Sequence, residues 1–506
     1  MSILGLDIGT TGVKAVAFTT EGKPLVSSYQ EYHLINPEEG FLELDPMEVL
    51  AGVRKVCREV AKATTADPVS SLSISTLGEA ALPVDENFEV LGNAIVGFDP
   101  RGQEQKEQLA AKISNNEVFG ITGHGINSYH TLFKIMWWRD SHPEIFARTR
   151  YFLTFSDFVI SRLGLEPRID YSNAARTLSF DIHTSTWSKK ILEAANLEPI
   201  FAQPIAPGEA VGEIGSNDFG LPEGCVVAGG LHDQPAGILG AGILPGESML
   251  ATGTVVCLGV RLDSHPEPGP MIENNLCYYP TFGEGQRVSL AWNFTGGSLL
   301  KWYRDQLGAG ERAEAERRGV DPYEVICGEL PEDPTSVFVL PHFTTAGTPS
   351  FDPRALGAIL GLRLTTSRQE IAKAVLEGVT YEVLLNADLM AKSGIEIERY
   401  KAIGGAAKSP VWLQLYADIL NRPVVQLEVT EGAALGVALL GAHGAGRCSA
   451  KEVHEVISNQ TREGTVFEPN AQRAARYRER FEIYRDIYDT TQDLTHRIYE
   501  LVKRRG

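Results

Sequence analysis

The most informative acidic residue of the chain lies in a stretch that otherwise avoids charge. Asp233 stands within the glycine-rich, aliphatic run 226–240. A carboxylate in such surroundings costs free energy unless it is paired or used in chemistry. It could accept a proton from a substrate hydroxyl while Gln234 binds a neighbouring hydroxyl, although an aspartate that caps a turn would show the same pattern. His232 is expected to be a hydrogen-bonded core residue, because the sequence has no G-x-S-x-G nucleophile motif.

Two turns rich in glycine and threonine each join a pair of strand-like segments. The first, Gly9-Thr10-Thr11-Gly12, lies in the segment 4–18, and the second, Thr252-Gly253-Thr254, lies in the segment 249–260. Each pattern predicts a β-hairpin whose free backbone N–H groups could hold the phosphates of a nucleotide. Asp7, just before the first turn, could bind Mg²⁺ through water molecules, and a turn-capping aspartate is the equal alternative.

A third glycine pair follows the strand-like segment 400–403. Gly404 and Gly405 precede a helical pattern with Trp412, Leu415 and Tyr416 on one face. The chain has no Walker A motif and no G-x-G-x-x-G fingerprint after a strand. Any nucleotide site must therefore use another arrangement of glycines.

Charged residues also follow two apolar segments in the first quarter of the chain. Glu79 follows the segment 69–76, and Asp99 and Arg101 follow the segment 94–98. Carboxylates and guanidinium groups can bind the vicinal hydroxyls of a sugar in a fixed geometry, although each of these residues alone is more often a surface charge. A glycosidase pair is the alternative, but it does not explain the phosphate-type turns.

The two predicted hairpins lie about half a chain apart and indicate a weak internal duplication. We expect an α/β protein with two similar halves, residues 1–245 and 246–506, because the glycine-rich segment 240–246 precedes the second hairpin. The segment 367–393 predicts one long helix that ends before Gly394. An apolar stripe near the end of the chain predicts a terminal helix packed on the body; it consists of Tyr477, Phe481, Tyr484, Tyr488, Leu494, Ile498 and Leu501.

Composition excludes several classes of protein. The 506 residues carry 46 Lys plus Arg against 65 Asp plus Glu, a net charge of −19, so a nucleic-acid partner is not expected. The six cysteines form no CxxC pair, and we expect reduced thiols rather than zinc ligands or disulfides. No run of 18 apolar residues and no signal-peptide pattern occurs, which favours a cytoplasmic protein without a membrane span.

Taken together, these motifs resemble the FGGY family of carbohydrate kinases, which belongs to the ATPase superfamily that includes actin. LDIGTTGVKAVAF is similar to the first phosphate motif of the family, ATGTVVCLGV to the second, and AIGGAAKSPVWLQLYADIL to its adenosine motif. GGLHDQPAGILGAG is similar to the segment with the catalytic aspartate, and residues 357–377 match the C-terminal signature. The resemblance extends from residue 3 to about residue 490.

The resemblance implies two actin-like (ribonuclease H-like) domains, a central catalytic cleft that closes on the sugar, and a homodimer. It implies transfer of a phosphoryl group from ATP to a small sugar or polyol, most readily a ketose such as a pentulose. Asp233 would be the catalytic base, and Asp7 and Asp233 would hold Mg²⁺. Glu79, Asp99, Arg101, Asp233 and Gln234 would bind the substrate. The ATP-binding residues would be Gly9, Thr10, Thr11, Gly12, Lys14, Thr252, Gly253, Thr254, Gly404, Gly405, Ala406 and Lys408.

One segment departs from the family pattern. Glycerol kinases carry Gln-Arg-Glu, and xylulokinases Gln-Met-His, where this chain has Leu77-Gly78-Glu79. We therefore expect neither a standard glycerol kinase nor a standard xylulokinase. A sugar-sensing regulator of weak activity and an actin-like ATPase are the alternatives on the same fold.

Overall fold

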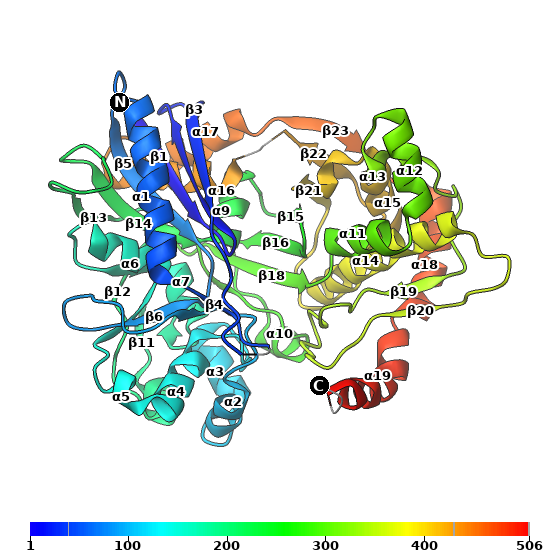
Figure 1. Cartoon of the computed structure of the whole chain (residues 1–506), viewed down its shortest axis with the longest axis horizontal. Helices are drawn as coiled ribbons and strands as arrows, with labels where there is room; N and C mark the ends of the chain where they lie inside the picture. Colours follow the sequence, from blue (N-terminus) through cyan, green and yellow to red (C-terminus); the bar gives the residue numbers. More distant parts are fainter. Residues whose placement is uncertain (39, 429–430, 504–506) are drawn as a thin grey trace.

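A computed structural model describes residues 1–38, 40–428 and 431–503, and it shows two lobes, each built on one large mixed β-sheet (Figure 1). The first lobe contains a six-stranded sheet in the order β13-β14-β5-β1-β2-β3. Strands β1 (Ser2–Ile8), β5 (Val69–Thr76) and β14 (Val226–His232) run parallel in its centre, and β2 (Gly12–Phe18) forms the predicted hairpin with β1.

The second lobe contains a seven-stranded sheet in the order β17-β18-β16-β15-β21-β22-β23. Its strand β15 (Glu247–Thr252) forms a hairpin with β16 (Val256–Leu262) and lies parallel to β21 (Arg399–Ile403), which lies parallel to β22 (Val424–Leu427). Both sheets thus begin with a hairpin, continue with two parallel strands and end with an antiparallel edge strand. The predicted duplication is confirmed, and this is the two-domain α/β, actin-like fold that was expected.

The remaining elements of the first lobe are β3 (Pro24–Glu31), β4 (Glu43–Leu44), α1 (Pro46–Ala63), β6 (Ala81–Val84), β7 (Ala94–Ile95), α2 (Gln103–Ala110), α3 (Asn115–Thr122), α4 (Thr131–Ser141), α5 (Pro143–Phe146), β8 (Tyr151–Thr154), α6 (Phe155–Arg162), β9 (Arg168–Asp170), α7 (Tyr171–Arg176), β10 (Phe180–Asp181), β11 (Thr186–Trp187), α8 (Lys189–Ala195), β12 (Gln203–Ile205), β13 (Ala210–Glu213) and α9 (Asp233–Gly240).

The later elements are α10 (Pro268–Glu273), β17 (Tyr279–Pro280), β18 (Arg287–Asn293), α11 (Gly297–Gln306), α12 (Ala309–Arg318), α13 (Pro322–Gly328), β19 (Phe338–Leu340), β20 (Ala358–Leu360), α14 (Arg368–Lys392), a short 3₁₀ turn (Ala406–Lys408), α15 (Pro410–Leu420), α16 (Gly432–Gly444), α17 (Ala450–Gln460), β23 (Glu463–Phe467), α18 (Ala471–Tyr484) and α19 (Ile487–Lys503).

Helices α9 and α16 pack against each other and connect the two lobes. Helix α16 comes late in the chain, yet it lies against β1, β5 and β14 of the first sheet. The helices approach so closely that a Cβ atom on Gly240 would lie 1.7 Å from the carbonyl oxygen of Gly432, so only glycine fits there. The two sheets fall on either side of residue 245, but α16 crosses back, and the proposed division of the chain into 1–245 and 246–506 stays a prediction.

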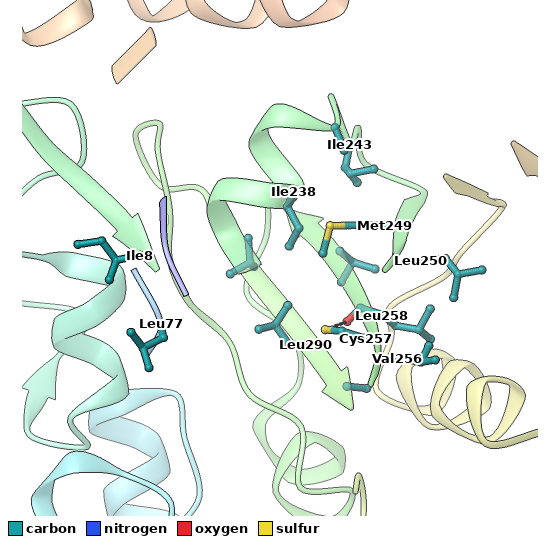
Figure 2. Close-up of a cluster of buried hydrophobic side chains, with 14 of the residues drawn as sticks. Ile8, Leu77, Ile238, Ile243, Met249, Leu250, Val256, Cys257, Leu258 and Leu290 are labelled. Carbon is teal, nitrogen blue, oxygen red and sulfur yellow. Dashed lines mark hydrogen bonds between the residues drawn. The ribbon is translucent and has the colours of Figure 1, made fainter. Parts of the chain in front are cut away.

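A continuous apolar core extends beneath this crossing (Figure 2). Ile238 of α9 lies beside Met249, Leu258 and Leu290 of the second sheet, while Ile8 and Leu77 come from the first. All of these side chains are at most 5% exposed. Any movement of one lobe relative to the other must therefore involve the apolar side chains that pack around α9.

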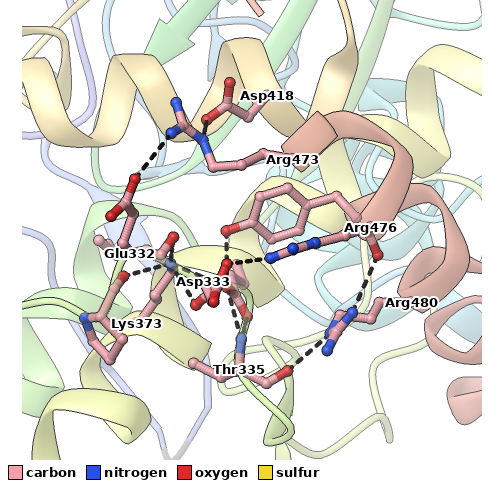
Figure 3. Close-up of polar contacts among 12 residues, drawn as sticks. Glu332, Asp333, Thr335, Lys373, Asp418, Arg473, Arg476 and Arg480 are labelled. Atoms are coloured by element: carbon pink, nitrogen blue, oxygen red, sulfur yellow. Dashed lines mark hydrogen bonds and ion pairs between the residues drawn. The ribbon is translucent and has the colours of Figure 1, made fainter. Parts of the chain in front are cut away.

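The C-terminal stripe is divided between two helices, which differs from the single packed helix predicted. Tyr477, Phe481 and Tyr484 of α18 are buried, and α18 is held by Arg473, whose Nε donates to Asp418 over 2.6 Å, and by Arg480, which donates to the carbonyl of Thr335 (Figure 3). In α19, however, Leu494, Ile498 and Leu501 are 43–55% exposed. The chain turns at residues 485–486, so the apolar residues of α19 do not continue the buried face of α18.

Other predictions from the sequence are confirmed. Helix α14 begins after Ser367, whose side chain accepts from the N–H of Glu370 in a capping box, and it ends before Gly394. All six cysteines are free thiols, and five of them are buried. Within the ranges that the structure describes, no helix combines the length and apolarity needed to span a bilayer.

Candidate active site

Three parallel strands deliver three carboxylates to one edge of the first sheet. Asp7 lies on β1 next to its end, Glu79 follows β5, and Asp233 follows β14. The register pairs Thr76 of β5 with both Ile8 and His232, so the three strands end level with one another. In open α/β sheets, ligands bind beyond the carboxyl ends of parallel strands. The sheet therefore brings together three of the acidic residues singled out in the sequence.

Asp233 stands at the start of α9 with its side chain one-third exposed. Its Oδ1 lies 3.0 Å from Nε2 of His232, whose Nδ1 lies 2.9 Å from the hydroxyl of Tyr279 in the second lobe. Burial alone would raise the pKa of Asp233, but the charge and hydrogen bond of His232, together with Gln234, hold this pKa below its ordinary value. The carboxylate is therefore ionised at neutral pH and can accept a proton.

His232 occupies the core position expected for it. It is 4% exposed, and its backbone N–H donates to the Ser172 hydroxyl over 2.8 Å. This histidine fixes the orientation of Asp233 and also links the first lobe to Tyr279 of the second.

Asp7 is an acid whose negative charge is poorly compensated. The hydroxyl of Ser75 donates to its Oδ1 over 2.7 Å. Burial, assisted by the nearby charges of Asp233 and Glu431, raises the pKa of Asp7 to about 6, although Ser75 and Lys14 oppose that rise. Two carboxylates held close together in this way suit an oxygen-binding cation. Among the described residues, no cluster of three or more potential metal ligands occurs.

Glu79 adopts a backbone conformation that residues other than glycine rarely take. Its φ is 62°, which costs of the order of 1–3 kcal/mol and is found most often at functional sites. Nε of Arg176 donates to its Oε1 over 2.5 Å. The Arg176 guanidinium also lies 5.1–5.8 Å from the ring centres of Tyr129, Tyr279 and Trp292. Arg176 and Glu79 thus form a fixed ion pair with an aromatic surround.

Several buried polar atoms in this region have no hydrogen-bond partner among the residues described, and Oδ1 of Asp233 is one of them. Two of the others are Nη1 of Arg176 and Oε1 of Gln234, next to Asp233. Buried polar atoms are satisfied in the great majority of cases, so each points to a missing partner. Hydroxyl groups of a ligand could satisfy both, because a hydroxyl donates and accepts.

The side chains of Asp99 and Arg101 form hydrogen bonds with each other and with residues outside this group of carboxylates. Arg101 donates to Asp99 over 2.7–2.9 Å and to Glu43 over 2.6 Å, and Oδ2 of Asp99 also accepts from the N–H of Leu42. Both side chains are at most 3% exposed. Lys134 donates to the carbonyl groups of both residues, and burial lowers its pKa to about 7. Asp99, Arg101, Glu43 and Lys134 therefore form a buried hydrogen-bonded cluster.

The second lobe contains a pocket of about 950 Å³ at the carboxyl ends of β15 and β21. Six of the predicted nucleotide residues line it, namely Thr252, Gly253, Thr254, Gly405, Ala406 and Lys408. Gly404 stands beside it with φ 95°, and a Cβ atom there would lie 2.7 Å from the carbonyl oxygen of Thr252. The hydroxyl of Thr252 donates to the carbonyl of Ile403 over 2.8 Å and joins the two strand ends. A nucleoside could lie in this pocket.

The first glycine–threonine turn lies outside that pocket, beside Asp7. The N–H of Gly9 donates to the carbonyl of Gly12, and the hydroxyl of Tyr32 donates to both carbonyls, which closes the turn. Lys14 Nζ lies 2.5 Å from Oε1 of Glu431, just before α16. Thr10 in this turn is half-buried, and Thr11 is exposed. The two turns therefore belong to different lobes.

Sequence reasoning missed several residues of this site. One of them is Arg176, whose neighbours Tyr129 and Trp292 lie far from it in the chain. Gly297 and Ser298, at the start of α11, also line the pocket of the second lobe. The glycine pair 296–297 before a helical pattern is a recognisable signal for a phosphate-binding helix start. Arg176 lies in the segment ARTLSFDI, which resembles the family, but this segment does not predict the partner of the arginine, which is 97 positions away.

The chain is similar to known proteins over almost its whole length. The chain is 27% identical over 499 residues to the xylulose kinase of Bacillus subtilis, with 97% of each chain covered. It is 31% identical over 484 residues to the glycerol kinase of Alkaliphilus metalliredigens, with 92% of this chain and 93% of that one covered. A solved xylulose kinase of Brucella ovis superposes with a TM-score of 0.86 at 25% identity, covering 98% of this chain and all of the other.

These relatives overturn the expectation that the chain is neither a standard glycerol kinase nor a standard xylulokinase. The expectation was wrong because it rested on the three residues Leu77-Gly78-Glu79. A Cβ atom at Gly78 would lie 2.8 Å from Nε2 of His232, so a side chain does not fit here, and the guanidinium beside Glu79 comes from Arg176 instead. A missing arginine in one segment does not mean a missing guanidinium in the site.

The family models cover most of the chain. The N-terminal domain of the FGGY family of carbohydrate kinases matches residues 2–240, and its C-terminal domain matches residues 249–445. Kinases of this family are phosphotransferases with an alcohol group as acceptor. The chain therefore belongs to the FGGY family of carbohydrate kinases, as the sequence resemblance implied.

Proposed function

We propose that the protein transfers the γ-phosphoryl group of ATP to a primary hydroxyl of a small sugar, most readily a ketose such as a pentulose. The observation that carries this proposal is the pairing of two strand-end sites. One offers the acids Asp7, Glu79 and Asp233, and the other offers a nucleotide-sized pocket. The similarity to xylulose kinases favours a pentulose over other acceptors.

Asp233 acts as the general base in this proposal. The substrate hydroxyl donates its proton to Asp233 while its oxygen forms a bond to the γ-phosphorus, and the bond between that phosphorus and the bridging oxygen of ADP breaks. His232 holds the carboxylate in the required orientation. Most of the rate acceleration comes from positioning the two reactants rather than from the base itself.

The sugar lies against Glu79, Arg176 and Gln234. Glu79 accepts hydrogen bonds from hydroxyl groups, while Nη1 of Arg176 donates to a sugar oxygen and gains the partner that it lacks. Asp99 and Arg101, predicted as direct contacts, support this surface from behind through Lys134. Closure of the lobes then excludes water from the phosphoryl group.

ATP binds across the two glycine–threonine turns. The adenosine occupies the pocket beside Gly404–Ala406, and backbone N–H groups of the turns 9–12 and 252–254 hold the phosphates. Lys14 and Lys408 lie close enough to these turns to add positive charge. The oxygens of Asp7 and Asp233 are the groups that would hold Mg²⁺, which would neutralise negative charge on the phosphates of ATP.

A substrate panel tests the proposal. ADP release is followed by a coupled assay with ketoses, aldoses, alditols and aldonates, each at the same concentration. We expect one sugar to raise the rate well above the rate without sugar. ADP release that is equal with and without every sugar would favour the actin-like ATPase, and sugar binding without ADP release would favour the sensor. A homodimer and a cytoplasmic location also belong to this proposal, and light scattering checks the dimer.

A further inference from the structure

An aromatic residue of the second lobe reaches across to the proposed sugar site. Phe351 lies in the segment 341–357, which connects β19 and β20. Its ring centre is 5.4 Å from that of Tyr129 in the first lobe and 6.3 Å from that of Trp292 in the second. All three side chains are only partly buried. These three rings form an aromatic wall between the lobes.

The aromatic wall borders the ion pair that would bind the sugar. The guanidinium of Arg176 lies 5.3 Å from the ring centre of Tyr129 and 5.1 Å from that of Trp292. Small-molecule sites commonly combine apolar or aromatic walls with a few fixed polar groups. Here the polar groups are Arg176 and Glu79, and the rings offer a surface for the carbon skeleton of a sugar.

The backbone beside Phe351 is held firmly in place. The N–H of Thr348 donates to the carbonyl of Trp292 over 2.9 Å, and the N–H of Trp292 donates to the hydroxyl of Thr348 over 3.1 Å. Nδ2 of Asn275 donates to the carbonyl of Pro349 over 2.5 Å. Phe351 itself has φ 43°, in a region that aromatic residues rarely adopt. Such a conformation persists only when the surroundings enforce it.

The residue after Phe351 is anchored by the C-terminal helix. Oδ2 of Asp352 accepts from the hydroxyl of Tyr488 over 2.6 Å, from Gln492 over 3.3 Å and from Nε2 of His496, all on α19. Its Oδ1 accepts from the N–H of Arg354. Burial would raise the pKa of Asp352, but these hydrogen bonds lower it to about 2, so the acid stays ionised. One face of α19 therefore serves to hold the segment that carries Phe351.

We propose that Phe351 is a specificity-determining residue that packs against the carbon skeleton of the sugar, and that α19 positions it through Asp352. The proposal rests on the assignment of Arg176 and Glu79 to the sugar site made above. It gives α19 a role in substrate binding although, among the described residues, no hydrogen bond or ion pair joins this helix to Asp233. It also explains why the turn at residues 485–486 directs Tyr488 and His496 towards Asp352 instead of continuing the apolar stripe.

Steady-state kinetics of full-length variants test this proposal, with the best sugar from the substrate panel as acceptor. We expect Phe351→Ala to raise the KM for sugar by about 10- to 100-fold, because it removes a large apolar surface, while the KM for ATP stays within twofold. His496→Ala should raise the KM for sugar by about fivefold. If His496→Ala fails to fold, Tyr488→Phe, which removes only one hydroxyl, should also raise the KM for sugar.

The control is Arg497→Ala, which changes the exposed residue next to His496 on α19 and should leave both KM values unchanged. Equal rises in the KM for ATP and for sugar, or a sugar KM within twofold of the wild type in the Phe351 and α19 variants, would overturn the proposal. Quenching of Trp fluorescence by sugar separates it from the proposed function. Wild-type quenching that moves to higher sugar concentration in Phe351→Ala supports the aromatic wall even if no sugar stimulates ADP release. Quenching curves that coincide would refute it.

Discussion

Asp7 is expected to destabilise the unliganded protein, and its removal should show this directly. Its pKa rises from 3.8 to about 6 on folding, because the carboxylate is buried close to Asp233 and Glu431. Each pKa unit corresponds to 1.36 kcal/mol, so ionising Asp7 in the folded state costs at most about 3 kcal/mol. Asp7→Asn keeps the shape and the hydrogen bond from Ser75 but removes the charge.

The pH at which this cost appears follows from the direction of the change. A carboxyl group whose folded pKa is raised binds its proton more tightly in the folded state, so stability falls as pH rises from about 4 to about 6 and stays reduced above that. We therefore expect Asp7→Asn to be more stable than the wild type at pH 8, by up to about 3 kcal/mol, and equally stable near pH 4. The same variant should lose its activity, because it lacks the carboxylate charge that is proposed to hold Mg²⁺.

Thermal and denaturant unfolding at pH 4.5, 6 and 8, without nucleotide or metal, measures this difference. An unfolding entropy of about 2.1 cal/mol/K per residue gives a chain of 506 residues a shift of about 1 °C per kcal/mol, so the melting temperature should rise by up to about 3 °C at pH 8. Asp493→Asn, at an exposed position on α19, is the matched control and should change little. An Asp7→Asn protein that is less stable than the wild type at pH 8, or a difference that does not vary with pH, would refute the reasoning.

Three further results are expected. Apparent Mg²⁺ affinity in the ADP-release assay should fall as pH drops through about 6, where protons compete for Asp7; an affinity that is constant between pH 5.5 and 7.5 would contradict this. Gly404→Ala should raise the KM for ATP about tenfold, because the added Cβ would meet the carbonyl of Thr252, whereas Gly394→Ala, with a similar φ but open space around it, should leave the KM for ATP unchanged. Glu79→Gln should raise the KM for sugar and lower kcat about 10- to 100-fold without affecting ATP binding, as nucleotide titration would check; a KM for sugar within twofold of the wild type would argue against Glu79 as a sugar contact.

The sequence predicts the strand ends well because the glycine turns and the acids next to them are local features. Asp7, Glu79 and Asp233 each follow an apolar strand, and parallel strands bring their carboxyl ends to one edge. Arg176 could not be found in this way, since it comes from a short helix and meets Glu79 only in the folded structure. Asp99 and Arg101 illustrate another limit, because Arg101 pairs both with Asp99 and with Glu43, a partner that no local pattern reveals.

The end of the chain illustrates a second limit. An apolar stripe continues from Tyr477 to Leu501 with helical spacing, yet the chain turns at residues 485–486 and the stripe divides. Periodicity shows which residues share a face of a helix, but it does not show where tertiary hydrogen bonds end one helix and orient the next. In this chain, the contacts of Asp352 with Tyr488 and His496 provide that direction.

The most direct test of the central claim is a comparison of Asp233→Asn with the wild type in sugar-dependent ADP release, together with nucleotide binding measured by titration calorimetry. Asparagine keeps the size of the side chain but cannot accept the proton, so we predict a 10²- to 10⁴-fold loss of kcat with ATP affinity within threefold of the wild type. A variant that retains activity within tenfold of the wild type would show that Asp233 is not the base.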